Sequence, residues 1–212
     1  KRIEFKGKAT FDEFEMTIYD NATIQQKAKS FELWGDENWD GLYDFFVKNK
    51  LNLDSKTGKP WPPFNGFIKI EKVLKGNEII SYGVYFDRFQ SNKVLSGSFA
   101  SPVYKGEYNK IDMPFTYDSR ALLDDIKEGT YYIKFKIKDP RGLEFKIGDA
   151  IPWKNASGKN QQGLAKQIQS NIKFDMIDPT AIDVVQISVK KGEWMDEISD
   201  FSKQLDNFKF CK

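Results

Sequence analysis

Residues 131–137 read Tyr131-Tyr132-Ile133-Lys134-Phe135-Lys136-Ile137, and this stretch says most about the fold. Its odd-numbered positions are all apolar or aromatic, whereas the positions between them hold a tyrosine and two lysines. Because successive side chains of a β-strand point to opposite faces, the alternation predicts a strand with one face in a core. The sequence Asp139-Pro140-Arg141-Gly142 then predicts the turn that closes this strand.

Further strands are expected on both sides of this segment. Residues 66–102 contain short runs rich in apolar side chains at 67–70, 79–82 and 85–89, with a turn at 75–77. Residues 182–189 are rich in β-branched side chains, which favour strands.

Helices are expected outside these strands. Residues 20–32 contain many helix formers, and Asn38 can cap a helix whose apolar residues recur at helical spacing, namely Trp39, Leu42, Tyr43 and Phe46. Two short helices are expected, one capped by Asp118 or Ser119 and reaching residue 126, the other at 164–168 after a loop at 155–160. A C-terminal amphipathic helix is indicated by large apolar residues spaced four and three apart: Trp194, Ile198, Phe201, Leu205 and Phe208.

The class is therefore α+β, and 212 residues fit one domain. We expect residues 1–60 to be a helical lead-in and residues 61–212 to be the core of the same domain. Residue 1 is Lys instead of Met, so the chain is expected to be a processed fragment or an excised domain.

Composition excludes several kinds of chemistry. The formal charge is +2 and no basic block alternates with aromatics, so nucleic-acid binding has little support. Apolar runs are only a few residues long, which excludes a membrane-spanning helix. The chain has no histidine and one cysteine, Cys211, so it lacks Ser-His and Cys-His catalysis, His-ligated zinc and an internal disulfide. Chemistry is left to Arg, Lys, carboxylates, amides, Tyr and the backbone, and no metal site is implied.

Four short motifs stand out in a fixed order. They are Trp61-Pro62-Pro63-Phe64-Asn65-Gly66-Phe67, Phe86-Asp87-Arg88-Phe89, Gly97-Ser98-Phe99-Ala100-Ser101-Pro102, and Ile151-Pro152-Trp153 followed by Gln162. Each motif alone is weak, since an Asp-Arg pair on a strand is usually a solvated face or a salt bridge, and large aromatics such as Trp153 are more often core anchors.

Together, the motifs resemble the tuberculosis necrotizing toxin family of NAD glycohydrolases, found as toxin domains of bacterial polymorphic toxins and in secreted fungal NADases. That family also has a Pro-Phe…Arg-x-Leu stretch, which Pro114-Phe115…Arg120-Ala121-Leu122 matches. The resemblance runs from Trp61 to Gln162, roughly half of the chain. The chain looks like a divergent member: Tyr132 stands where the family often has a histidine, Phe99 where it often has a tyrosine, and Gln90 where it has a glycine, and its glycine-rich loop is reduced to Gly158.

The resemblance implies cleavage of NAD or NADP, as substrate and not as cofactor, to nicotinamide and ADP-ribose. Arg88 matches the functional arginine and Gln162 the functional glutamine, and Tyr132 is expected to be the third catalytic residue. The residues expected to bind substrate are Asp87, Phe89, Phe99, Arg120 and Trp153. A guanidinium suits the pyrophosphate, and a neutral amide can hydrogen-bond the ribose or the carboxamide without repelling the cationic ring. Asp87 either complements positive charge developing on the ribose or forms an ion pair with Arg88.

The same resemblance implies a two-sheet core distantly related to the ADP-ribosyltransferase scaffold, with a cleft between the sheets. It also implies an effector domain of a larger secreted or delivered protein, acting in the target-cell cytoplasm, and a cognate immunity protein that plugs the cleft lined by Arg88 and Gln162. Two other functions stay open: a mono-ADP-ribosyltransferase, and a non-catalytic β domain that binds glycans or another ligand.

Overall fold

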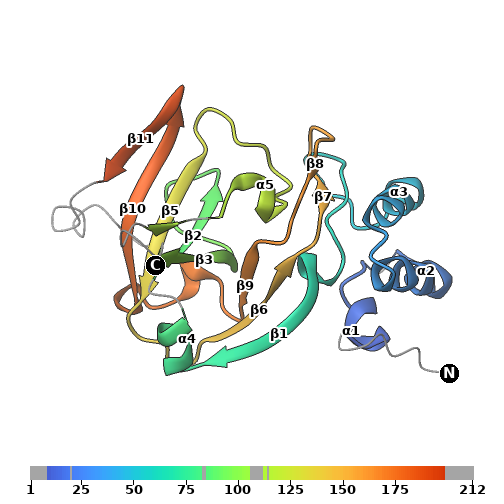
Figure 1. Ribbon diagram of the computed structural model, residues 1–212, viewed down its shortest axis with the longest axis horizontal. Helices are drawn as coiled ribbons and strands as arrows, with labels where there is room; N and C mark the ends of the chain where they lie inside the picture. The colour runs from blue at the N-terminus through green and yellow to red at the C-terminus, as the bar shows by residue number, and fades with distance from the viewer. Residues whose placement is uncertain (1–8, 20, 83–84, 106–111, 114, 199–212) are drawn as a thin grey trace. The chain divides into compact units, whose positions relative to one another are not determined.

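The computed structural model describes residues 9–19, 21–82, 85–105, 112–113 and 115–198 (Figure 1). In these residues the chain is an α+β protein with a large antiparallel sheet and few helices. None of the described helices combines the length and the apolarity that crossing a membrane requires.

The chain forms two compact units, each with its own hydrophobic core. Unit 1 comprises the described residues of Lys1–Glu71, Thr116–Asp125 and Gly148–Ala165. Unit 2 comprises those of Lys72–Phe115, Ile126–Ile147 and Lys166–Lys212. Each unit therefore combines three stretches that are separated in the sequence.

Unit 1 begins with short helices that start at side-chain caps. α1 (Phe11–Glu15) and α2 (Ile24–Gly35) both open with a capping box, which in α2 pairs Thr23 with Gln26. The helix expected at residues 20–32 therefore begins four residues later, where a threonine can satisfy the first free N–H groups.

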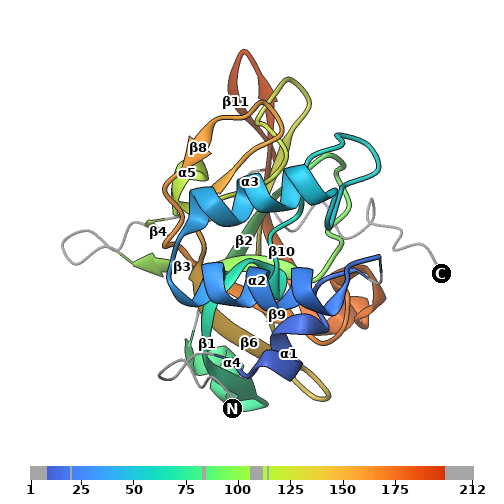
Figure 2. The same cartoon turned by 90° about the vertical axis from the view of Figure 1, so that its right-hand side faces the viewer.

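The third helix of unit 1 confirms its sequence signal. α3 (Trp39–Asn49) is capped by Asn38, whose side chain accepts from the Gly41 N–H. It ends at Lys50, which adopts a left-handed conformation. α2 and α3 lie side by side (Figure 2).

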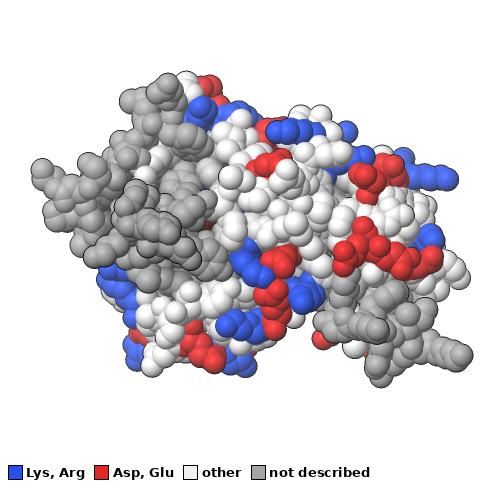
Figure 3. All heavy atoms as spheres, in the orientation of Figure 1, with Lys and Arg blue, Asp and Glu red and all other residues white. Residues whose placement is uncertain are grey.

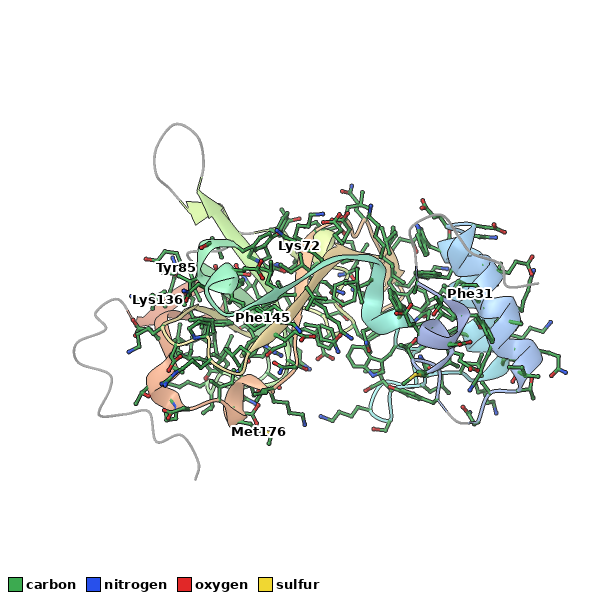
Figure 4. All side chains as sticks on the ribbon, turned by 90° about the horizontal axis from the view of Figure 1, so that it is seen from below. Phe31, Lys72, Tyr85, Lys136, Phe145 and Met176 are labelled. Carbon is green, nitrogen blue, oxygen red and sulfur yellow. The ribbon has the colours of Figure 1, made fainter. Side chains whose placement is uncertain are left out.

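Aromatic side chains fill the core of unit 1. Trp34 is fully buried, and its indole Nε1 donates to the carbonyl of Phe67 at 3.1 Å. Phe14, Phe31 and Phe64 surround it, with ring centroids between 5.1 and 5.8 Å from that of Trp34. Figure 4 shows Phe31 pointing in among the helices. Burying rings of this size supplies most of the stabilisation that short helices cannot provide alone.

The large sheet has nine strands within the described residues. Its path runs β1 (Phe67–Lys75), β6 (Glu144–Ala150), β9 (Lys166–Ser170), β3 (Phe99–Lys105), β2 (Tyr85–Gln90), β5 (Tyr131–Ile137), β10 (Ile182–Lys191) and β11 (Glu193–Ile198), and β4 (Asp112–Met113) pairs with β3. Two further strands, β7 (Trp153–Lys154) and β8 (Asn160–Gln161), form a separate hairpin. One large sheet and a hairpin thus replace the expected two-sheet core. Single 3₁₀ turns lie at Phe64–Gly66, Phe174–Met176 and Pro179–Ala181.

The strand at residues 131–137 is confirmed as the centre of unit 2. Ile133, Phe135 and Ile137 are buried in its core, whereas the side chains between them are only partly buried. Phe86 of β2 pairs with Phe135, and Figure 4 shows Phe145 of β6 among the inward-pointing side chains. The alternation in the sequence therefore identified the core face correctly.

Two short segments differ from their expected structure. Residues 79–82 belong to helix α4 (Asn77–Tyr82) instead of a strand, because Gly76 turns the chain; Ile79 is buried in the core and Tyr82 packs against it. Helix α5 (Tyr117–Arg120) is capped by Thr116 and ends at Ala121, which has a positive φ of 50°, before it reaches residue 126.

Two expected helices are strands. Residues 166–170 form β9, which pairs with β3, and Trp194 and Ile198 lie in β11, which pairs with β10 across a turn at Gly192. A spacing of four suits one face of a helix and equally one face of a strand, so it could not separate the two. The expected helical positions Phe201, Leu205 and Phe208 lie outside the described residues.

Candidate functional site

Asp87 and Arg88 are neighbours in sequence but lie on opposite faces of the sheet. In β2, Asp87 pairs with Ser101 and Lys134, whereas Arg88 pairs with Ile133. Directly paired residues share a face, and Ile133 is a core residue of unit 2. Arg88 therefore projects on the core side and Asp87 on the other, and the ion pair between them that the sequence left open is not formed.

Arg88 is a partly buried cation with unused hydrogen-bonding capacity. Its Nη1 donates to the carbonyl oxygen of Phe99 at 3.0 Å, while its Nε is buried without an acceptor. No ion pair among the described residues includes it. Burial lowers the pKa of Arg88 to about 10, and Asp175 opposes this shift from a distance. The guanidinium therefore keeps its charge at neutral pH.

Gly97 lies against this guanidinium in a backbone conformation that favours glycine. A Cβ on Gly97 would lie 2.7 Å from Arg88 Nη1, and its φ of +72° favours glycine. Its N–H donates to Asp175 Oδ1 at 3.0 Å, and its carbonyl accepts from the Phe174 N–H at 2.7 Å. The glycine of the motif at 97–102 thus lets the loop lie directly against Arg88.

On the opposite face, Tyr132 and Asp87 form a hydrogen-bonded pair. The Tyr132 hydroxyl donates to Asp87 Oδ2 at 2.8 Å, and the Asp87 side chain is fully buried. Phe89 pairs with Tyr132 across the strands, and the two ring centroids are 5.4 Å apart. The Tyr132 hydroxyl thus gives a hydrogen bond to a buried carboxyl group, whose burial without a partner would be costly.

Tyr132→Phe tests this pair. We expect it to lower the free energy of unfolding by about 1–3 kcal/mol, because it leaves the buried Asp87 carboxylate short of a donor. Chemical denaturation of the purified variant measures the loss. Tyr131→Phe is the matched control, since the Tyr131 hydroxyl makes no hydrogen bond within the described residues and should be dispensable. Equal stability of the two variants would contradict the assigned role of the Tyr132 hydroxyl.

Five of the predicted site residues gather at adjoining strand ends of unit 2. Arg88 and Phe89 lie near the end of β2, Phe99 begins β3, and Tyr132 is the second residue of β5. Phe99 is 37% exposed and Asp87 is buried. The structure thus brings this set together, but with Arg88 on one face of the sheet and the Asp87–Tyr132 pair on the other.

The remaining three predicted residues belong to unit 1. Gln162 follows β8 and is exposed, whereas Arg120 ends α5 and is buried. Trp153 is 3% exposed, its Nε1 donates to the Pro60 carbonyl at 2.9 Å, and its ring meets that of Tyr43 edge-on. These contacts identify Trp153 as a structural anchor of unit 1.

Sequence reasoning missed two polar residues of unit 1, the half-buried Tyr117 and the buried Gln161. Burial raises the pKa of Tyr117, as do the charges of Asp125 and Asp124, whereas side-chain hydrogen bonds with Gln161 and Asn155 lower it. Gln161 is only 3% exposed. Gln161 lies in β8, which pairs with β7, and each of these strands has only two residues. An alternation of side chains over two residues is too short to recognise in a sequence.

Charged side chains of both signs occur, interspersed, on the face of the described residues that Figure 3 shows. Within the part of the chain that is described, no three His, Cys, Asp or Glu side chains gather closely enough to hold a metal ion.

Comparisons with protein-family models, with curated proteins and with solved structures gave no match. The likeness to the NAD glycohydrolase family therefore rests on the sequence motifs alone, and any function must be argued from residues and their surroundings.

Proposed function

We propose that this protein is an NAD(P)+ glycohydrolase, which cleaves the nicotinamide–ribose bond to give nicotinamide and ADP-ribose. The observation that carries the proposal is the state of Arg88: a partly buried cation that forms no ion pair among the described residues and has an Nε without an acceptor. The phosphate groups of NAD supply the negative charge and the hydrogen-bond acceptors that this guanidinium does not find in the protein. The motif supports the same role, since Arg88 stands at the position of the family's functional arginine.

The reaction is compatible with a chain that has no histidine. Water adds to the anomeric carbon of the ribose as the bond to the nicotinamide nitrogen breaks, and the electron pair of that bond goes to the ring. The cationic ring becomes neutral on leaving and so needs no proton. The proton lost by the water passes to solvent. Positioning and electrostatic stabilisation of the oxocarbenium-like transition state can therefore supply the catalysis.

Thermal unfolding with a panel of ligands tests the part played by Arg88. A ligand that binds only the folded chain raises its melting temperature. NAD, ADP-ribose and pyrophosphate should each raise the melting temperature of the parent, and adenosine, which lacks phosphate, should not. A shift from sugars but from none of the phosphate compounds would contradict the proposal and favour the glycan-binding alternative.

Product analysis separates hydrolysis from transfer. With NAD labelled in its adenine, a glycohydrolase releases label as free ADP-ribose, whereas a mono-ADP-ribosyltransferase attaches it to protein. We expect the label in free ADP-ribose, in equal amount to nicotinamide. Label recovered mainly on protein would make the chain a transferase.

The pH dependence of NAD cleavage follows from the groups present. Without histidine, kcat/KM should be flat between pH 6 and 8, since an unperturbed imidazole would titrate near pH 6.5 and none exists. Burial lowers the pKa of Arg88 to about 10. Because a phosphate binds the protonated form of Arg88, kcat/KM should fall as the pH rises through that value. Initial rates across this range check both statements, and an inflection near pH 6.5 would contradict the first.

A further inference from the structure

The loop of residues 91–97 lies between β2 and β3 of unit 2 (Figure 1), and the side chain of Gln90 holds its backbone. The Gln90 Nε2 donates to the carbonyl oxygen of Asn92 at 2.7 Å and to that of Val94. Its Oε1 accepts from the Ser96 N–H at 3.3 Å. An amide offers two N–H donors and an oxygen acceptor, so this one side chain replaces water as the partner of three backbone groups.

The far end of the same loop is anchored to the rest of unit 2. Leu95 is 2% exposed and belongs to the core of the unit. The Gly97 N–H donates to Asp175 Oδ1 at 3.0 Å, and the Gly97 carbonyl accepts from the Phe174 N–H at 2.7 Å. Residues 91–94 are all exposed, so the course of the backbone there depends on the glutamine amide.

The loop fixes the direction of the Arg88 guanidinium. A Cβ at Gly97 would lie 2.7 Å from Arg88 Nη1 and 3.1 Å from Nη2, so the glycine backbone lies against this group. Nη1 donates to the Phe99 carbonyl at 3.0 Å. Nη2 makes no hydrogen bond within the described residues, and unlike Nε it is not sealed from solvent. Nη2 is therefore the donor that a ligand can reach.

The charge of Arg88 makes an anion the ligand that this donor suits. Asp175 raises the pKa of Arg88, but burial lowers it more, to about 10, so the group is a desolvated cation at neutral pH. A phosphate oxygen at Nη2 would form a charge-assisted hydrogen bond. Because the guanidinium is already oriented, binding does not carry the cost of ordering it.

We infer that Gln90 is a positioning residue for Arg88. It holds the 91–97 loop so that Gly97 fixes the guanidinium with Nη2 directed at a phosphate group of the substrate. The identity of that substrate as NAD rests on the proposed function, whereas binding of a pyrophosphate group does not require hydrolysis. The inference also gives a role to a departure from the toxin-family motif, since a glycine at position 90 would have no side chain to hold the loop.

Two variants of the full chain, Gln90→Leu and Asn171→Leu, separate positioning from support of the fold. Asn171 is the matched control because its amide also bonds exposed backbone of unit 2, accepting from the Glu144 N–H at 2.9 Å and donating to the Gly142 carbonyl at 3.0 Å. Each variant should lower the melting temperature by a few degrees. In titration calorimetry with pyrophosphate, Gln90→Leu should bind about 10-fold more weakly than the parent, and Asn171→Leu as tightly as the parent.

Steady-state kinetics with NAD give a readout that a general loss of stability does not move. Gln90→Leu should raise KM about 10-fold and leave kcat nearly unchanged, because the substrate and the transition state share the contact with the phosphates. In the Arg88→Ala background, Gln90→Leu should change kcat/KM no further, since Gln90 acts through Arg88. An equal loss in both backgrounds would contradict this coupling.

Gly97→Ala tests the contact while leaving Gln90 in place. Its methyl group would push the Arg88 guanidinium aside and should weaken pyrophosphate binding about 10-fold as well. Gly142→Ala is the matched control, because its φ of +75° is close to the +72° of Gly97 and nothing lies within 4 Å of a Cβ there. It shares the backbone strain without the contact, so it should bind pyrophosphate as the parent does.

Pyrophosphate affinity that is unchanged in Gln90→Leu, or weakened equally in Asn171→Leu, would overturn the inference. If Gln90→Leu does not fold, the two glycine variants decide, and equal affinities of Gly97→Ala and Gly142→Ala would overturn it. A parent that binds pyrophosphate through Gln90 and Arg88 but leaves NAD intact would retain the inference and reject the glycohydrolase. A parent that hydrolyses NAD with the same KM with and without the Gln90 amide would retain the glycohydrolase and reject the inference.

Discussion

Arg88→Ala should lower kcat/KM for NAD by about 100-fold or more while the chain stays folded. The variant removes a charged, fork-shaped donor whose Nε has no acceptor in the protein, and the loss of one such contact in a water-poor site typically costs two to three orders of magnitude. Folding should survive, because the one hydrogen bond lost, to the Phe99 carbonyl, is exchanged for relief of a desolvated charge. Steady-state kinetics and circular dichroism check the two halves of this prediction.

Arg141→Ala is the matched control for Arg88→Ala. Arg141 lies in an exposed turn, where its side chain is 89% exposed and bonded to Asp139. Arg141→Ala should leave kcat/KM unchanged, since Arg141 is not one of the predicted site residues. Arg88→Lys should retain part of the activity, because an ammonium keeps the charge and loses the bidentate geometry. A folded Arg88→Ala variant with near-parental kcat/KM would contradict the assignment of Arg88.

Gly148→Ala should cause a large loss of stability for a single added methyl group. Gly148 lies in β6 within unit 1, and a Cβ there would lie 2.0 Å from the Lys69 carbonyl oxygen and 2.9 Å from Phe67 Cδ1. The carbonyl belongs to the backbone and cannot rotate away, so the strands must separate locally. We expect a loss of about 3 kcal/mol in the free energy of unfolding, the upper end of what overpacking costs.

Gly158→Ala separates this steric effect from a conformational one. Nothing lies within 4 Å of a Cβ at Gly158, so only its φ of +82° opposes a side chain. A left-handed conformation costs a non-glycine residue about 1–2 kcal/mol. Denaturant titrations should therefore rank Gly148→Ala below Gly158→Ala in stability. The opposite order would show that β1 and β6 approach each other less closely than described.

The sequence predicted those elements whose signals are local and unambiguous. The strand at 131–137 alternates over seven residues, and Asn38 supplies a cap just before an apolar run. Prediction from the sequence failed where one spacing suits both a helix and a strand. Trp194 and Ile198 were expected in a helix and lie in strand β11. The apolar pair Ile79-Ile80 suits either a strand or a helix, and the turn at Gly76 favours the helix α4 that the structure shows.

The sequence motifs select the candidate site residues but do not fix the arrangement of their side chains. The motifs singled out Arg88, Asp87 and Tyr132, yet the face to which each side chain points depends on register across three strands. A shift of one residue moves a side chain to the other face, and no local pattern fixes that shift in a half-polar strand. The spacing of the motif selects Gln162, which is exposed, and the hairpin buries its neighbour Gln161.

The central claim is that the chain breaks the nicotinamide–ribose bond of NAD, and proton NMR of NAD incubated with the purified chain tests it most directly. The account predicts that the resonances of the ribosylated nicotinamide ring decrease as those of free nicotinamide and ADP-ribose increase in equal amounts, at a rate proportional to protein concentration and absent with Arg88→Ala. An NAD spectrum that stays unchanged with folded parent protein at high concentration would contradict the claim.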